Sequence, residues 1–187
     1  MPRRTQITPH IFTLPEVLDP RECEAMILRA ETGGFEVAPI NAAGGVRVVR
    51  ETRNNDRVMI DDEELAARLW SRVRDEAPVM LEGRQARGLN ERFRFYRYSC
   101  GQKFDWHSDG SFERKNGERS FLTFMVYLNE GYSGGGTRFQ DCSVIGMTGM
   151  ALVFEHGLIH QGAEISHGVK YVLRSDVMYG PIGQFRA

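Results

Sequence analysis

This sequence of 187 residues has little cysteine, no long hydrophobic run and almost no net charge. Its three cysteines, Cys23, Cys100 and Cys142, are scattered and odd in number, which argues against a disulfide framework and against a CxxC metal knuckle. We therefore expect reduced thiols and a cytoplasmic protein. No apolar run is long enough to cross a bilayer, and the N-terminal stretch lacks the apolar core of a signal peptide.

The charges nearly balance, with 24 basic and 25 acidic residues and a net charge of −1. This balance gives no general electrostatic reason to expect a nucleic-acid or membrane partner. The chain is 41% hydrophobic and 26% charged, as is typical of a soluble globular protein with a sizeable core. Its length predicts one domain over residues 1–187. Oligomeric state is not predicted.

The first half of the chain predicts two helices. Asp19-Pro20 should open the first and Gly33-Gly34 should end it. Asp61-Asp62 should cap a second helix over Glu63–Ala77. Each helix has an apolar stripe, so both should pack on one face of a sheet. Short strands are expected over 7–14, 35–40 and 57–60, the first two at sheet edges because each contains a proline.

Two other segments of this half lack a regular pattern. Asn41–Asn55 contains Gly44-Gly45 and several arginines, and we interpret it as an excursion that is either a plain surface loop or a substrate-contacting lid. Residues 78–90 are interpreted as a connector.

After Glu91 the chain becomes strand upon strand, separated by glycine-rich turns. Helices followed by some eight short strands predict an α+β fold with a double-stranded β-helix, a jelly-roll or cupin-like barrel. We divide the domain into helical support over 15–80 and a metal-binding core over 91–180. Strands are expected over 91–98, 121–128, 137–139, 150–154, 158–160 and 171–179, and a polar loop over 111–119.

The stretch Tyr98–Gly110 reads YSCGQKFDWHSDG and holds His107 and Asp109 two residues apart. In an extended strand, alternate side chains point to the same face, so an imidazole and a carboxylate can reach one point. One further histidine from a distant strand would complete two histidines and one carboxylate, a set that binds one face of an octahedral Fe(II) and leaves the other positions open.

His156, His160 and His167 are the candidates for the third ligand. His156 and His160 would share one face of a helix, as in zinc hydrolases. However, Ala151–Phe154 predicts a strand and Gly157 would break a helix. Any one of the three taken alone is more often a surface or core histidine than a ligand.

Lys170 lies ten residues after His160, at the start of the last predicted strand. There Lys170, Val172 and Arg174 share one face. A buried cation is costly unless it meets an anion. The anion is either a co-substrate or an internal carboxylate, for which Asp176 on the same face is the obvious candidate.

From Phe93 to Tyr179 the chain resembles the Fe(II)/2-oxoglutarate-dependent oxygenases, in the branch similar to prolyl 4-hydroxylases. The matching pieces occur in order: Y-x-x-G before H-x-D, then V-Y-L-N, G-G-x-T-x-F and A-L-V-F, and a final H followed by K in G-x-K-Y. H-x-D alone is common by chance, whereas the ordered set is specific.

The resemblance implies a role for each matching residue. His107, Asp109 and His160 would ligate Fe(II), and Lys170 would bind the C5 carboxylate of 2-oxoglutarate. Tyr98 and Tyr127 would line or bond the co-substrate site, with packing in the barrel core as the alternative for each. Arg174 would contact the C1 end of the co-substrate or an anionic group of the substrate. Substrate-contact candidates at the barrel mouth are Arg57, Tyr96, Arg174 and the two loops at 41–55 and 111–119.

The implied reaction consumes O2 and 2-oxoglutarate, releases succinate and CO2, and hydroxylates an unactivated C–H bond of a small-molecule or peptide substrate. Ascorbate is left open as an auxiliary reductant. Two alternatives stay open: a cupin-like metal enzyme that does not use 2-oxoglutarate, and a non-catalytic binding module. Arg47, Arg50, Arg53 and Arg57 favour an acidic partner or simply form a solvated basic loop. Because ligating imidazoles must be neutral, iron affinity is expected to fall as pH drops through the histidine range.

Overall fold

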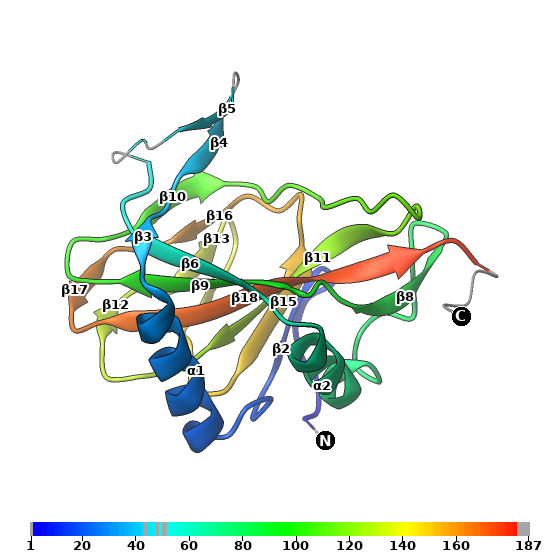
Figure 1. Cartoon of the computed structure of the whole chain (residues 1–187), viewed down its shortest axis with the longest axis horizontal. Helices are drawn as coiled ribbons and strands as arrows, with labels where there is room; N and C mark the ends of the chain where they lie inside the picture. Colours follow the sequence, from blue (N-terminus) through cyan, green and yellow to red (C-terminus); the bar gives the residue numbers. More distant parts are fainter. Residues whose placement is uncertain (1, 43–44, 48, 50–51, 183–187) are drawn as a thin grey trace.

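The computed structural model describes residues 2–42, 45–47, 49 and 52–182. This part of the chain is mostly antiparallel β-sheet with two helices, α1 (Pro20–Gly33) and α2 (Glu63–Val73), on the same side of the large sheet (Figure 1). The arrangement is consistent with a jelly-roll-like fold. No helix within the described residues is long and apolar enough to cross a membrane.

The large sheet runs in the order β1-β2-β15-β11-β18-β9-β6-β3, and all of its pairs are antiparallel. Its members are β1 (Thr5–Thr8), β2 (Ile11–Leu14), β15 (Ala151–Glu155), β11 (Arg119–Tyr127), β18 (Lys170–Gly180), β9 (Arg92–Tyr98), β6 (Asp56–Asp61) and β3 (Glu36–Val37). β8 (Arg84–Leu89) also pairs with β18, and β7 (Met80–Leu81) pairs with β8. β3 ends the order, so the segment at 35–40 lies at an edge as predicted. The segment at 7–14 is not one edge strand: Pro9 lies in the turn between β1, at the edge, and β2, which pairs with both β1 and β15.

A smaller sheet, in the order β10-β16-β13-β14, faces the large one and carries part of the site. It consists of β10 (Phe104–His107), β16 (His160–Gly162), β13 (Thr137–Phe139) and β14 (Ser143–Val144). Two strand pairs complete the described elements: β12 (Ser133–Gly134) with β17 (Ile165–His167), and β4 (Ile40–Ala42) with β5 (Gly45–Arg47). The β4–β5 hairpin projects from the body next to β10 (Figure 1).

Strand alternation divides the core into two clusters. On β9, Phe93 and Phe95 pack with the buried faces of α1 and α2, whereas Tyr96 and Tyr98 face the cluster between the two sheets. β15 alternates in the same way. This is the pattern expected for a sheet covered on both faces. It leaves polar side chains of the second cluster between the sheets, where the site forms.

The predicted helix signals are confirmed. Asp19 caps α1, and its carboxylate accepts from the backbone N–H of Glu22 while the Glu22 carboxylate accepts from the N–H of Asp19. Gly34 ends α1 with a φ of 78°. Asp62 caps α2, whose last helical residue, Val73, comes four residues before the predicted end.

The interpretation of residues 78–90 as a connector is wrong. β7 and β8 form a hairpin whose two loop residues, Glu82 and Gly83, have φ values of 51° and 70°. Positive φ at both loop residues is the type I′ geometry that matches strand twist. A Glu-Gly pair is a weaker signal for that turn than Asn-Gly, which explains why the hairpin was not predicted.

The excursion at 41–55 is more ordered than a plain loop where it is described. It contains the β4–β5 hairpin, while Arg50 and four other positions lie outside the described residues. Its C-terminal part runs beside β10, since Arg53 bridges to Phe104 and the N–H of Asp105 donates to the carbonyl of Thr52 at 2.8 Å. Arg53 is thereby only 5% exposed, so the solvated-loop interpretation is wrong at this residue.

Candidate functional site

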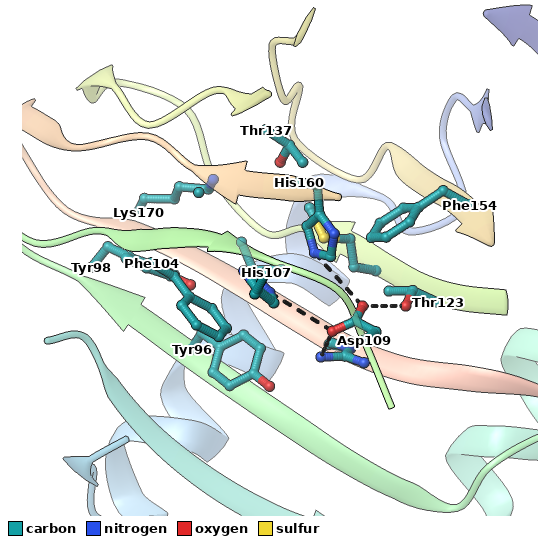
Figure 2. Close-up of a pocket in the computed structure, with 14 residues that line it drawn as sticks. Tyr96, Tyr98, Phe104, His107, Asp109, Thr123, Thr137, Phe154, His160 and Lys170 are labelled. Atoms are coloured by element: carbon teal, nitrogen blue, oxygen red, sulfur yellow. Dashed lines mark hydrogen bonds and ion pairs between the residues drawn. The ribbon is translucent and has the colours of Figure 1, made fainter. Parts of the chain in front are cut away.

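Three side chains with metal-binding groups converge between the sheets, and we call them the triad (Figure 2). His107 ends β10, Asp109 follows two residues later, and His160 begins β16 directly across from His107. Nε2 of His107 lies 3.8 Å from Asp109 Oδ1, and Nε2 of His160 lies 3.7 Å from Asp109 Oδ2. An octahedral ion with bonds of about 2.1 Å places neighbouring donors about 3 Å apart, so only small side-chain shifts are required.

Backbone carbonyls set the tautomer of both histidines. Nδ1 of His107 lies 2.7 Å from the carbonyl oxygen of Asp105, and Nδ1 of His160 lies 2.9 Å from that of Leu158. Each Nδ1–H therefore donates to a carbonyl, and each Nε2 directs its lone pair toward Asp109. Burial, with His160 next to it, lowers the pKa of His107 to about 4, and burial also lowers the pKa of His160. Both imidazoles are neutral near pH 7, as ligation requires.

A chain of hydrogen bonds holds the Asp109 carboxylate from behind, and we call it the relay. Thr123 Oγ1 donates to Asp109 Oδ2 at 2.5 Å, His156 Nδ1 donates to Thr123 Oγ1 at 3.0 Å, and Ser120 Oγ donates to His156 Nε2 at 2.9 Å. Thr123 has a single hydroxyl hydrogen and an ionised Asp109 can only accept, which fixes this direction. Burial lowers the pKa of His156, so its ring is neutral as the relay requires.

Arg174 forms an ion pair with the same carboxylate. Burial alone would raise the pKa of Asp109, but Arg174, whose Nη1 lies 2.8 Å from Asp109 Oδ1, holds that pKa well below its usual range. Asp176 lies 3.4 Å from Arg174 Nη2 and 3.1 Å from Arg94 Nη1. The alternative in which Asp176 neutralises Lys170 is therefore wrong, because two arginines bind Asp176.

Lys170 is 3% exposed and has no carboxylate within ion-pair distance anywhere in the described part of the chain. Its Nζ donates to the carbonyl of Gly135 at 2.5 Å and lies 5.1–5.9 Å from the ring centres of Tyr127, Tyr98 and Tyr132. The rings contribute cation–π attraction but no opposite charge. Burial lowers the pKa of Lys170 to about 7.

The surroundings of Lys170 depend on a glycine and on paired hydroxyls. Gly135 has a φ of 65°, and a Cβ there would come within 2.3 Å of Ile165, so the close approach of its carbonyl to Lys170 requires glycine. Tyr127 bonds Thr137 Oγ1 through its hydroxyl at 2.8 Å. The hydroxyl of Tyr132 is buried without a partner among the described atoms.

Two cavities meet at the triad. The inner cavity, of about 40 Å³, extends to Lys170 and Thr137. The outer cavity, of about 610 Å³, extends to Arg53, Arg57 and Arg94. Five residues line both of them: Tyr96, Phe104, His107, Asp109 and Arg174.

The structure brings most of the predicted site residues together. Tyr98 lines the inner cavity and Arg57 the outer one, while Tyr96 and Arg174 line both. Tyr127 lies behind the inner cavity, where its ring packs in the cluster between the sheets and its hydroxyl bonds Thr137. His167 is exposed on β17 and stays outside the site.

Several residues of the site were not predicted. Thr123 is a polar residue in the apolar run FLTFMVYL, a signal that could have been used. Ser120, and the role of the candidate ligand His156 as its partner, depend on the pairing of distant strands, which the sequence does not display. Tyr132 lies in a segment interpreted as a turn. Arg53 was among the arginines expected to favour an acidic partner, but its burial beside Phe104 was not predicted.

The chemistry of these groups fits a divalent metal and an anion. Two neutral imidazoles and one ionised carboxylate form a donor set typical of Fe(II) with open positions. The inner cavity offers a buried ammonium without a carboxylate partner, and the Tyr132 hydroxyl nearby lacks a hydrogen-bond partner. A small dianion could bind the open metal positions with one end and pair with the Lys170 ammonium at the other.

Comparisons with known proteins agree with this chemistry. Residues 93–175 match the family model described as the 2OG-Fe(II) oxygenase superfamily. Over 136 residues the chain is 29% identical to prolyl 4-hydroxylase 13 of Arabidopsis thaliana, an alignment that covers 70% of this chain and 47% of that protein. The chain thus spans about half the length of this curated relative.

Similar solved structures include three prolyl hydroxylases. Viral collagen prolyl hydroxylase from Paramecium Bursaria Chlorella virus-1, in its 2OG complex, has a TM-score of 0.65 at 18% identity over 90% of this chain and 96% of its own. A Pseudomonas putida prolyl-4-hydroxylase has a TM-score of 0.65 at 19% identity over 90% and 93%. A Trichoplax adhaerens prolyl hydroxylase, bound to a hypoxia inducible factor peptide, has a TM-score of 0.66 at 16% identity over 91% and 84%. At such identities the likeness shows the fold alone.

Proposed function

We propose that this chain is a member of the 2OG-Fe(II) oxygenase superfamily, whose family model matches residues 93–175, and that it is a dioxygenase related to the prolyl 4-hydroxylases. It would use Fe(II) and 2-oxoglutarate to hydroxylate an unactivated C–H bond. One observation carries the proposal: the triad and a buried lysine that lacks a carboxylate partner border the same inner cavity. A metal site alone would not require the buried lysine, and an anion site alone would not require the triad.

His107, Asp109 and His160 would hold the iron through two Nε2 atoms and a carboxylate oxygen. When bound there, iron, 2-oxoglutarate and O2 supply oxidative decarboxylation, which releases succinate and CO2 and hydroxylates the substrate. Lys170 binds the C5 carboxylate of the co-substrate through its ammonium group. Tyr98 and Tyr127 exclude water from that ion pair, which strengthens it.

The remaining residues fix orientation. The relay keeps Asp109 in one rotamer, and the Nδ1–H bonds of the two histidines keep both rings directed at the metal. Arg174 contacts Asp109 and, at the meeting point of the two cavities, is placed to contact the co-substrate C1 end or the substrate. Arg57 and Tyr96 contact the substrate from the outer cavity.

The substrate is a peptide or a small molecule that presents one C–H bond at the triad. Prolyl residues are the first candidates because the similar proteins bear prolyl hydroxylase names. Free amino acids are the second candidates, because arginines in the outer cavity suit a carboxylate.

The test is an anaerobic titration of the Fe(II)-loaded protein with 2-oxoglutarate. Chelation should produce a weak visible charge-transfer band, and admission of O2 should release succinate. The variant Asp109→Ala, which lacks one ligand, serves as the blank and should give neither signal. A wild-type protein that binds iron without the band would instead be a metalloprotein that does not use 2-oxoglutarate, an alternative that Lys170 disfavours.

A further inference from the structure

We propose that the substrate carries an oxyanion, a carboxylate or a phosphate, which Arg53 and Arg57 bind in the outer cavity on the side of the triad away from Lys170. This inference rests on the proposed function, because the bound anion would position the rest of the substrate beside the metal. It assigns the outer cavity a chemical class of ligand that prolyl hydroxylase likeness does not imply.

The two cavities separate two sets of cations. Lys170 borders the inner cavity and not the outer one, whereas Arg53, Arg57 and Arg94 border the outer cavity and not the inner one. His107 and Asp109 border both. An anion held by Lys170 and another held by Arg53 would therefore lie on different sides of the triad, as a co-substrate and a substrate must.

Arg53 forms a built site rather than a surface charge. Its guanidinium carbon lies 4.6 Å from the ring centre of Tyr96 and 4.3 Å from that of Phe104, and its Nε donates to Asn55 Oδ1 at 2.8 Å. Its Nη2 is buried and has no partner in the described part of the chain. Burying a guanidinium with an unused donor is costly, and an oxyanion in the outer cavity would accept from it.

The charge balance of the outer cavity favours an anion. Arg94 and Arg174 already share Asp176, and Arg174 also pairs with Asp109. No carboxylate of the described residues lies within ion-pair distance of Arg53 or Arg57, and Glu36, across from Arg57 on β3, also stays beyond that distance. Within the described residues, neither of these two guanidinium groups therefore forms an ion pair.

Tyr96 reports the resulting positive potential. Burial would raise the pKa of its hydroxyl, but Arg53, Arg174 and Arg94 together hold that pKa below its usual value. The potential acts in a partly enclosed site, where it is stronger than in water. A neutral prolyl peptide offers Arg53 Nη2 only uncharged carbonyl acceptors, whereas a carboxylate or phosphate carries the opposite charge and matches the planar fork of a guanidinium in two places.

The test uses pairs of probes that differ in charge, with the Fe(II)-loaded full chain and 2-oxoglutarate in the absence of O2. N-acetyl amino acids are offered as free acids and as amides, and phosphoserine is offered beside serine and inorganic phosphate. Binding is measured by isothermal titration calorimetry. We expect at least one anion to bind about tenfold or more tightly than its neutral counterpart, as a charge-assisted hydrogen bond should provide.

Three variants assign the effect. Arg53→Gln and Arg57→Gln should each remove the preference for the anion. Arg57 is only half buried, so its variant keeps the test valid if Arg53→Gln does not fold. Arg92→Gln is the matched control: it removes the same charge from an exposed position on β9 where Arg92 pairs with Asp61, and it should preserve the preference.

The outcomes separate the oxyanions from each other and from the proposed function. If only the free acids bind more tightly than their amides, the ligand group is a carboxylate. If only phosphoserine and inorganic phosphate bind tightly, it is a phosphate. Either result supports the proposal. Equal affinities within every pair, including no binding by any probe, overturn it, as does a preference that both arginine variants retain. The titrations are repeated without 2-oxoglutarate, so a failure of 2-oxoglutarate to bind refutes the hydroxylase while the anion preference is judged separately.

Discussion

The inner and outer cavities contain buried cations of different kinds in different surroundings. On the inner side, Lys170 has three tyrosine rings and a backbone carbonyl around it, and burial lowers its pKa to about 7. On the outer side, Arg94 pairs with Asp176, and Arg174, which borders both cavities, pairs with Asp109. Burial does not discharge a guanidinium near neutral pH. The inner charge therefore depends on pH and on the ligand, whereas the outer charges are permanent.

Because of this difference, the inner and outer cations should affect ligand binding and the stability of the fold in different ways. A buried ammonium without a carboxylate partner destabilises the folded chain, and a ligand carboxylate would offset that cost. The ion pairs around Asp109 stabilise the fold and also fix the triad. We infer that the inner side is adapted to one dianionic co-substrate, while the outer side provides a fixed positive surface.

Of the variants that test this difference between the cavities, Lys170→Met should cause the largest change in 2-oxoglutarate affinity. Loss of a charge-assisted hydrogen bond of about 1.5–3 kcal/mol should weaken 2-oxoglutarate binding by tenfold to about a hundredfold. Removal of the buried charge should at the same time raise the melting temperature of the ligand-free protein, by about 2–4 °C for each kcal/mol gained. Anaerobic titration of the charge-transfer band and thermal unfolding measure the two quantities.

The outer side supplies the control for this variant. Arg57→Gln should change 2-oxoglutarate affinity by less than about twofold, because Arg57 does not border the inner cavity. If Arg57→Gln weakened 2-oxoglutarate as much as Lys170→Met does, the division of labour between the two cavities would be wrong.

The second prediction concerns pH. Only the ammonium form of Lys170 binds a carboxylate, and its pKa in the free protein is about 7. The protonated fraction is nearly complete one unit below that pH and one half at it. The apparent Kd of 2-oxoglutarate should therefore rise about fivefold from pH 7 to pH 8 and about tenfold for the next unit. Titrations at successive pH values measure this slope.

Lys170→Arg isolates the cause, because a guanidinium stays charged across the range. Its apparent Kd, whatever its absolute value, should be flat where that of the wild type rises. A wild-type Kd that did not change between pH 7 and about pH 9 would show that Lys170 is more solvated than its burial implies.

The helices and the site ligands were predictable because their signals are local or form ordered motifs. Asp19 and Glu22 specify a cap within four residues, and the ordered motifs from Tyr98 to Lys170 resemble those of the family whose model matches residues 93–175. The β7–β8 hairpin was missed because its turn residues are weak formers of the geometry they adopt. Helix caps and ordered motifs can be recognised from residues close together in the sequence. The conformation of an unusual turn depends also on the strands that it connects.

Contacts among side chains from distant strands could not be predicted. Asp176 was a reasonable partner for Lys170 on one strand face, yet Arg94 from β9 takes it. Arg53 was assigned to a loop, yet pairing with Phe104 buries it. In both cases the sequence gives the charge of a residue, while the pairing of strands decides its partner.

The relay provides the third prediction. His156→Phe removes the donor to Thr123 and the acceptor of Ser120, so Asp109 should lose its fixed orientation. Outer hydrogen bonds of this kind typically contribute about 10–100-fold in metal affinity, and we expect a decrease of about tenfold, measured by anaerobic competition with a chelator. The charge-transfer band at saturating iron should remain, which separates a positioning role from ligation.

Two further variants check this interpretation. Ser120→Ala removes only the last donor and should decrease metal affinity less than His156→Phe does. His156→Gln retains a donor and an acceptor and should recover part of the loss. A His156→Phe protein with unchanged metal affinity would mean that the ion pair with Arg174 alone positions Asp109.

The smallest expected effect is the response of metal affinity to pH, and it completes the contrast with Lys170. Burial lowers the pKa of His107 to about 4 and also lowers that of His160, so both imidazoles take up a proton only in more acidic solution than an ordinary histidine does. Iron affinity should therefore stay nearly constant between pH 8 and pH 7 and fall at lower pH, as the two imidazoles become protonated. This sharpens the expectation that iron affinity falls as pH drops through the histidine range, because it places the fall on the acidic side of that range. Chelator competition at fixed ionic strength measures it, and a tenfold loss between pH 7 and pH 6 would mean that water reaches the two rings.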